Sequence, residues 1–298
     1  MRRHVVILPV LLLAFSAGCA SSTRARAPEE PRAVAAELLR IHMMLGATPD
    51  DEELVTFAAT EALQTAQRWG FLRHAVTLRV HSTHQQLEAA AHQRDVPWMR
   101  GWARFDEVEL EAPSSWGGHR SPESVVELLR HELTHVVMYQ RVAQRETWAS
   151  VDIPLWFREG MASVTSQQGY RRMTTDRLAR WLKRNPGADP WMGAEQLDSN
   201  AQPVVYGAAH RAFERLLARG GDAGILRILD GIRAGLSFDE AFSESLGTRP
   251  AVFLASFRVE LEGSSDEALL TSPVLMPMSH DTIGSGTHLL DAVPPHLH

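Results

Sequence analysis

The sequence of 298 residues has a single cysteine, Cys19, which excludes an intrachain disulfide and any zinc site built from several cysteines. A bound metal ion would therefore need His, Asp or Glu ligands. Basic residues are outnumbered by acidic ones, 30 against 36, and are spread along the chain, so the charge pattern does not indicate a nucleic-acid partner. With 44% apolar residues, the chain is long enough to bury a substantial core.

Long apolar runs are also scarce, and the run at residues 5–15 is too short to span a bilayer. Because charged residues precede this run, we interpret residues 1–18 as an export signal. The signal ends in Ser-Ala-Gly before Cys19, which resembles the lipoprotein box of bacteria, in which the cysteine is lipidated and anchors the protein to a membrane. A serine stands where that box usually has leucine, so cleavage near Ala20, giving an exported protein without an anchor, is the alternative.

The chain after the signal divides into three predicted parts. Residues 19–32 contain Ser and Pro without an apolar period, and we expect them to form a flexible tether. Residues 33–262 carry the periodic apolar pattern of a folded domain. Residues 263–298, rich in Ser, Pro and isolated His, are expected to be disordered. An exported protein of this kind would lie in the cell envelope, held to a membrane by the lipid on Cys19.

Apolar spacing predicts the elements of the folded domain. Helical spacing indicates two helices between residues 33 and 69, and alternation indicates a strand at residues 76–80. A helix over residues 83–93 and two short extended segments, 101–105 and 108–110, are expected to follow. From residue 122 to about residue 261 the strong signals are helical, so a few strands precede a long helical region.

One stretch of the helical region indicates a metal site: His131-Glu132-Leu133-Thr134-His135. On a helix, two imidazoles four residues apart lie on one face and can bind a single Zn²⁺ at about 2.0–2.1 Å. Glu132 is expected to point toward the same opening. An apolar stripe on the far side of this helix would face the core and leave the histidines toward a cleft. Two surface histidines on an amphipathic helix are the alternative.

A third ligand must come from another segment. The metzincin arrangement is excluded, because Met138 and Arg141 occupy the places of its glycine and its third histidine. Glu159, on the next predicted helix, is the candidate instead. Its neighbours are bulky and apolar, and an unpaired carboxylate buried among them would be costly. A solvated helix residue is the alternative interpretation of Glu159.

The two segments together resemble the gluzincins, in particular small envelope proteins with a peptidase MA-like domain. The first segment is residues 131–135, and the second has Trp156, Glu159, Gly160 and Ala162 in the family's Trp-x-x-Glu-Gly-x-Ala pattern. The resemblance covers roughly residues 70–262. It implies a predominantly helical α+β fold, with a small sheet and the active-site helix up to about residue 145 and a helical subdomain after it, on opposite sides of a cleft.

The resemblance also implies how a peptide would bind. Gluzincins hold the substrate as an extra strand along the edge of the sheet. In this sequence the candidate edge is the segment near Trp102 to Asp106, that is Trp102, Ala103, Arg104 and Phe105.

These residues predict a zinc metallopeptidase that cleaves a peptide or protein substrate in the bacterial cell envelope. One Zn²⁺ on His131, His135 and Glu159 would keep a fourth position for water and polarise the scissile carbonyl. Glu132 would take the proton of that water and pass it to the leaving amine. Endopeptidase action is favoured by the resemblance. The rival is a zinc-stabilised binding or assembly module in which the same ligands persist without hydrolysis.

The tetrahedral oxyanion formed during hydrolysis needs a donor besides the metal. Tyr206 and His210, four residues apart on a later predicted helix, share one face. By resemblance to related aminopeptidases the tyrosine is the expected donor, and His210 is a second candidate. Ordinary core-edge positions are the alternative for both residues.

Overall fold

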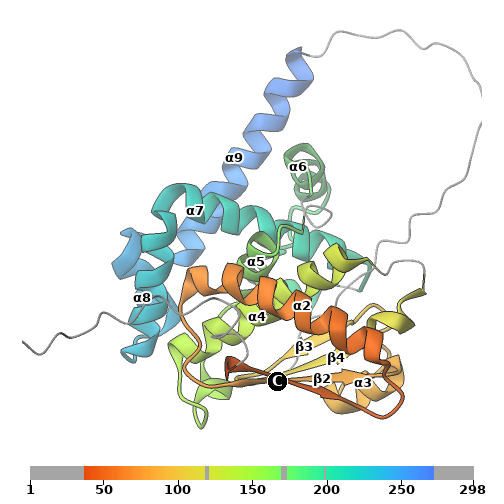
Figure 1. Cartoon of the computed structure of the whole chain (residues 1–298). Coiled ribbons are helices and arrows are strands. Elements are labelled where there is room, and N and C mark those ends of the chain that lie inside the picture. The colour runs from red at the N-terminus through yellow and green to blue at the C-terminus, as the bar shows by residue number, and fades with distance from the viewer. Residues whose placement is uncertain (1–36, 118–120, 169–172, 198, 272–298) are drawn as a thin grey trace, which may run out of the picture.

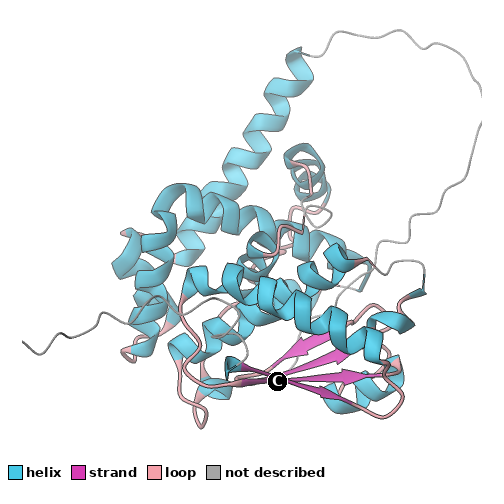
Figure 2. Ribbon diagram, in the orientation of Figure 1, coloured by secondary structure: helices cyan, strands magenta, loops and turns pink. Residues whose placement is uncertain are grey.

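The computed structural model of the protein describes residues 37–117, 121–168, 173–197 and 199–271. These residues form many helices and one small sheet (Figure 2), which confirms the predominantly helical α+β class. The predicted export signal, Cys19 and the predicted tether lie outside the described residues. Within the described part of the chain, no helix is both long and apolar enough to cross a membrane.

The sheet has four strands in the order β1-β2-β4-β3 (Figure 1). The strands are β1 (Leu39–Met43), β2 (Val76–His81), β3 (Gly101–Ala103) and β4 (Glu107–Glu111). β1, β2 and β4 run parallel, and β3 pairs antiparallel with β4 at the edge. The alternation predicted for residues 76–80 is confirmed, because Val76, Leu78 and Val80 are fully buried.

Strand β1 contradicts the sequence prediction, which placed a helix in this part of residues 33–69. Its five residues pair in parallel register with β2. Leu39, Ile41 and Met43 alternate with polar residues, so the segment satisfies the period of a strand as well as that of a helix. Pairing with a buried neighbouring strand stabilises the extended form, and this long-range contact outweighs the local spacing.

The helices that follow confirm the other helical predictions. Within the described residues they are α2 (Pro49–Ala66), α3 (His84–Ala91), α4 (Pro122–Val142), α5 (Leu155–Thr165), α6 (Thr175–Arg184), α7 (Gln202–Arg233), α8 (Phe238–Leu246) and α9 (Pro250–Thr271). α2 and α4 pack together over one face of the sheet, and α5 lies between α4 and α7 (Figure 1). The predicted domain end at residue 262 falls inside α9, which continues to Thr271 and includes the helix-favouring run Glu-Ala-Leu-Leu at residues 267–270. Residues 272–298 of the predicted tail lie outside the described residues.

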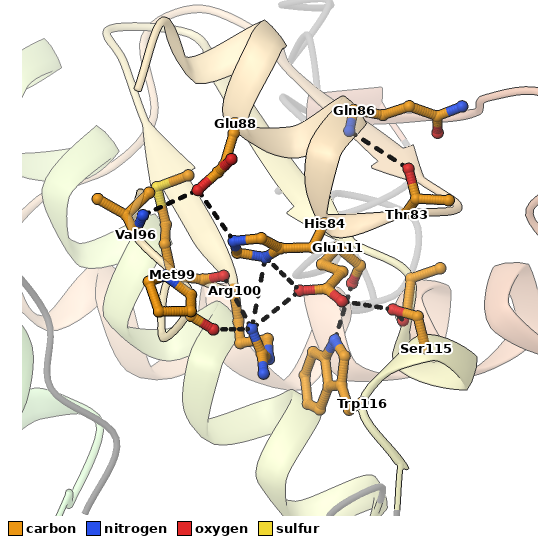
Figure 3. A network of polar contacts seen from close by, with 12 residues as sticks. Thr83, His84, Gln86, Glu88, Val96, Met99, Arg100, Glu111, Ser115 and Trp116 are labelled. Carbon is orange, nitrogen blue, oxygen red and sulfur yellow. Dashed lines mark hydrogen bonds and ion pairs between the residues drawn. The ribbon is translucent and has the colours of Figure 1, made fainter. Parts of the chain in front are cut away.

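A polar network fixes the start of the edge strand β3 (Figure 3). Glu111, at the end of β4, is buried, and its carboxylate lies 3.1 Å from Nη1 of Arg100 and 3.0 Å from Nδ1 of His84. Ser115 Oγ donates to the other oxygen of this carboxylate at 2.7 Å. The main-chain N–H of Glu111 also donates to the carbonyl oxygen of Arg100 at 2.9 Å. These bonds hold Arg100 in place, and Gly101, the first residue of β3, follows it directly.

Candidate metal centre

Helix α4 carries two of the three predicted ligands. It begins at a capping box in which the side chains of Ser121 and Ser124 each accept a hydrogen bond from the other residue's main-chain N–H, with Pro122 in the first turn. The helix then continues for 21 residues, so that His131 and His135 lie one turn apart on the same face. Both side chains are buried, and their ring centroids are 4.8 Å apart. The structure therefore agrees with the helical placement expected for this pair.

Helix α5 carries the third predicted ligand, Glu159, and its packing against other helices sets the position of this side chain. The rings of Trp156 and Phe157 meet edge to face, with centroids 5.7 Å apart, inside an aromatic cluster with phenylalanines of α7, α8 and α9. Glu159 follows and is only 1% exposed. The next residue, Gly160, permits close approach of α7, since a Cβ there would lie 2.5 Å from the carbonyl oxygen of Ala209. The cluster and the glycine together set where the carboxylate lies.

The donor atoms of the three side chains converge. Nε2 of His131 lies 3.2 Å from Nε2 of His135 and 3.4 Å from one carboxylate oxygen of Glu159. Nε2 of His135 lies 3.5 Å from the other oxygen. A tetrahedral ion with bonds of about 2.0–2.1 Å places its ligand atoms roughly 3.3–3.4 Å apart, so these separations fit one ion. Among the described residues, His131, His135 and Glu159 form a buried group that could hold a metal ion.

Glu132, the predicted general base, lies against the edge strand of the sheet. Its side chain is buried, and a Cβ added to Gly101 of β3 would lie 2.9 Å from its Oε1 atom. Because glycine has no side chain, Gly101 leaves room for the Glu132 carboxylate in its present position. Glu132 and the edge strand, which the sequence analysis singled out separately, therefore lie side by side.

The predicted substrate edge is shorter in the structure than in the sequence analysis. Trp102 and Ala103 lie in β3, but the strand ends there. Arg104 begins the turn to β4, where its N–H donates to the carbonyl oxygen of Glu107 at 2.7 Å. Phe105 is fully buried. The inclusion of Arg104 and Phe105 in the edge is therefore wrong, because a tight turn follows only three strand residues.

Tyr206 and His210, the predicted oxyanion donors, are both buried on α7. Nδ1 of His210 lies 2.7 Å from Oγ of Ser163 on α5, and its Nε2 lies 3.6 Å from a carboxylate oxygen of Glu214. These contacts favour the alternative interpretation of His210 as a residue that joins two helices. For Tyr206 the structure gives a buried position near the start of α7, and its role as a donor stays a prediction.

Tyr139 is a neighbour of the site that the sequence analysis missed. It lies one turn after His135 on α4, and the two rings stack with centroids 6.1 Å apart. Burial raises the pKa of its phenol, the positive charge of Arg158 opposes this rise, and the carboxylates of Glu159 and Glu132 add to it. The hydroxyl therefore keeps its proton at neutral pH. The spacing of four residues from His135 was the signal that could have identified it.

Gln168 is a second missed neighbour. It follows the end of α5, it is 2% exposed, and its Oε1 lies 3.0 Å from Nδ1 of His131. No spacing in the sequence links these two residues, which come from different helical segments.

Comparison of the chain with protein-family models and with curated proteins finds no match.

Proposed function

We propose that the protein is a zinc-dependent metallopeptidase of the gluzincin type that hydrolyses peptide bonds. The observation that supports this most strongly is the buried group of His131, His135 and Glu159, together with the buried Glu132, which follows His131 on α4. Three protein ligands are typical of a catalytic zinc site, whereas structural zinc sites usually have four. A structural site would also have no need of an additional buried carboxylate at this position.

The donor set supports zinc as the metal. Two imidazoles and one carboxylate suit zinc, and a hard cation such as Mg²⁺ or Ca²⁺ would instead favour oxygen ligands. When bound, the ion would polarise the carbonyl of the scissile peptide and make a water molecule acidic enough to attack at neutral pH.

The chain's own residues would provide the proton transfer and the substrate orientation. The Glu132 carboxylate would accept a proton from the attacking water and deliver it to the leaving amine. Strand β3 is the last strand in the order of the sheet, so its outer edge can pair with an extended peptide. Because Gly101 of β3 is in contact with Glu132, a peptide on this edge would lie close to the base. Tyr139, whose raised pKa keeps its hydroxyl protonated, and Tyr206 are the two candidate oxyanion donors.

Hydrolysis of a peptide library by the purified protein, with mapping of the products, tests this function. We expect internal cleavage and about one zinc per chain. Glu132→Gln should keep the zinc, because the base is not a ligand, and should lower kcat by about 10²–10⁴, because an amide cannot accept the proton. Glu123→Gln, an exposed carboxylate on the same helix, is the matched control and should cleave normally.

Equal cleavage by the Glu132→Gln variant would contradict the mechanism. Zinc in the wild type without hydrolysis of any peptide would favour the rival function, a zinc-stabilised binding or assembly module.

We also propose that the enzyme is exported and anchored in the cell envelope through a lipid on Cys19. The support is the charged and apolar pattern of residues 1–18 before the sole cysteine. Cys19→Ser should move the protein from the membrane fraction to the soluble fraction, because a single lipid-bearing cysteine would be its anchor. Cell fractionation detects where each protein lies, and mass spectrometry detects the lipid. If the wild type and Cys19→Ser distributed equally between the fractions, the protein would be exported without an anchor.

A further inference from the structure

We propose that Gln168 is a positioning residue of the metal centre: it holds the His131 ring in the orientation and tautomer that direct the Nε2 lone pair at the metal ion. This inference rests on the proposed zinc site, and it assigns a role to a residue that is neither a ligand nor the base.

The end of helix α5 places Gln168 against His131. After Thr165 the chain turns back, with Gln167 in the left-handed region at φ 59°. The N–H of Gln168 donates to the carbonyl oxygen of Ser163 at 3.1 Å, which closes the reversal. The side chain of Gln168 is thereby turned into the protein interior. Helix α5 thus contributes to the site twice, through Glu159 in its middle and through Gln168 just after its end.

The hydrogen bond to Gln168 decides which ring nitrogen carries the proton. A neutral imidazole has one N–H, and only the other nitrogen can bind a metal ion. In His131 the nitrogen that faces His135 and Glu159 is Nε2, so the proton must be on Nδ1. A buried N–H needs an acceptor, and the amide oxygen of Gln168 lies 3.0 Å away. Without it, the ring would lose the bond that fixes both its rotation and its tautomer.

The group that accepts the hydrogen bond from His131 is the neutral amide of Gln168. Two variants of this residue can separate the hydrogen bond from the bulk of the side chain. Gln168→Leu keeps a similar volume but removes the acceptor. Gln168→Glu keeps an acceptor oxygen at the same distance from the main chain, so it should preserve the orientation of His131. Recovery of zinc binding by Glu but not by Leu would identify the hydrogen bond, and not the bulk of the side chain, as the feature that matters.

The experiment measures the zinc dissociation constant by competition with a chromophoric chelator. We expect Gln168→Leu to weaken zinc binding by about 10- to 100-fold and Gln168→Glu to bind within a few-fold of the wild type. Gln140→Leu is the matched control, because Gln140 is also a buried amide but accepts hydrogen bonds from the main-chain N–H groups of Arg73 and His74. Its loss should lower the melting temperature and leave the zinc dissociation constant unchanged.

An unchanged zinc dissociation constant in Gln168→Leu would overturn the assignment while the zinc site itself stands. Failure of the wild type to bind zinc would instead overturn the proposed function together with this inference. If Gln168→Leu does not fold, NMR of the zinc-loaded wild type gives the answer. The Nδ1 proton of His131 should exchange slowly with water when Gln168 accepts it, and rapid exchange would refute the role.

Discussion

Gly101 is the residue at which the sheet and the predicted base meet, and its missing side chain has a testable consequence. A Cβ at this position would lie 2.9 Å from both Cγ and Oε1 of Glu132. Gly101→Ala should therefore push the carboxylate aside and lower kcat by roughly 10- to 100-fold, since small displacements of a catalytic group are costly. The flexible end of a side chain can move cheaply, so zinc content and melting temperature should change little.

The kinetic comparison for this variant uses Gly187→Ala as its control, because a Cβ at Gly187 meets nothing within 4 Å. Unaltered kcat in Gly101→Ala would show that Glu132 does not need its present position for catalysis.

The sequence predicted the residues of the candidate metal centre that follow local helical geometry. His131 and His135 lie on one face because a helix returns to the same face after four residues, and this holds whatever the rest of the fold does. Gln168 could not be predicted, because its contact with His131 depends on a reversal after one helix and on the packing of that helix against another. Tertiary contacts of this kind leave no periodic signal.

At the scale of elements, the contact between α5 and α7 determines the position of the Glu159 carboxylate. Gly160→Ala would bring a Cβ to 2.5 Å from the carbonyl oxygen of Ala209 and 2.7 Å from Cβ of Phe213. Both obstacles are close to the main chain, so the helices must separate. We expect a loss of about 1–3 kcal/mol in the free energy of unfolding. The shift of α5 should also weaken zinc binding, which calorimetry can measure in the same samples.

A glycine in another helix gives the control for this prediction. Gly263 lies in α9, and a Cβ there would meet nothing within 4 Å. Gly263→Ala should be neutral or should stabilise by up to about 1 kcal/mol through helix propensity. If Gly160→Ala behaved in the same way, the close approach of α5 and α7 would not be a determinant of the site.

The elements that the sequence predicted well are those whose apolar spacing fits a single period. The helical signal that begins at residue 122 and the alternation at residues 76–80 are examples, and they correspond to α4 and β2. The apolar spacing of residues 39–43 fits both a helix and a strand. The strand that pairs with them, β2, lies more than thirty residues further along the chain, so local spacing cannot reveal the pairing. Helix α9 also runs past the predicted domain end at residue 262, because the Ser, Pro and His of residues 263–298 as a whole hide the short helix-favouring run at residues 267–270.

At the scale of the whole molecule, the candidate metal centre joins two parts of the fold. α4 packs on α2 and on the sheet, and α5 packs in the helical layer with α7. His131 and His135 come from the first helix and Glu159 from the second, so an ion held by all three would connect the two layers. A ligand that binds only the folded protein raises the free energy of unfolding by RT ln(1 + [L]/Kd), which is about 2.7 kcal/mol at a free ligand concentration of 100 Kd.

Metal removal should therefore lower the stability of the entire domain and not only its activity. We expect EDTA to reduce the melting temperature of the wild type by several degrees, and added zinc to restore it. His131→Ala, which lacks one ligand, should melt at the same temperature with EDTA and with zinc. Calorimetric scans of both proteins under both conditions check this, and the comparison within each protein cancels any effect of the substitution itself on packing. If neither EDTA nor zinc changed the melting temperature of the wild type, no metal ion would link α4 to α5.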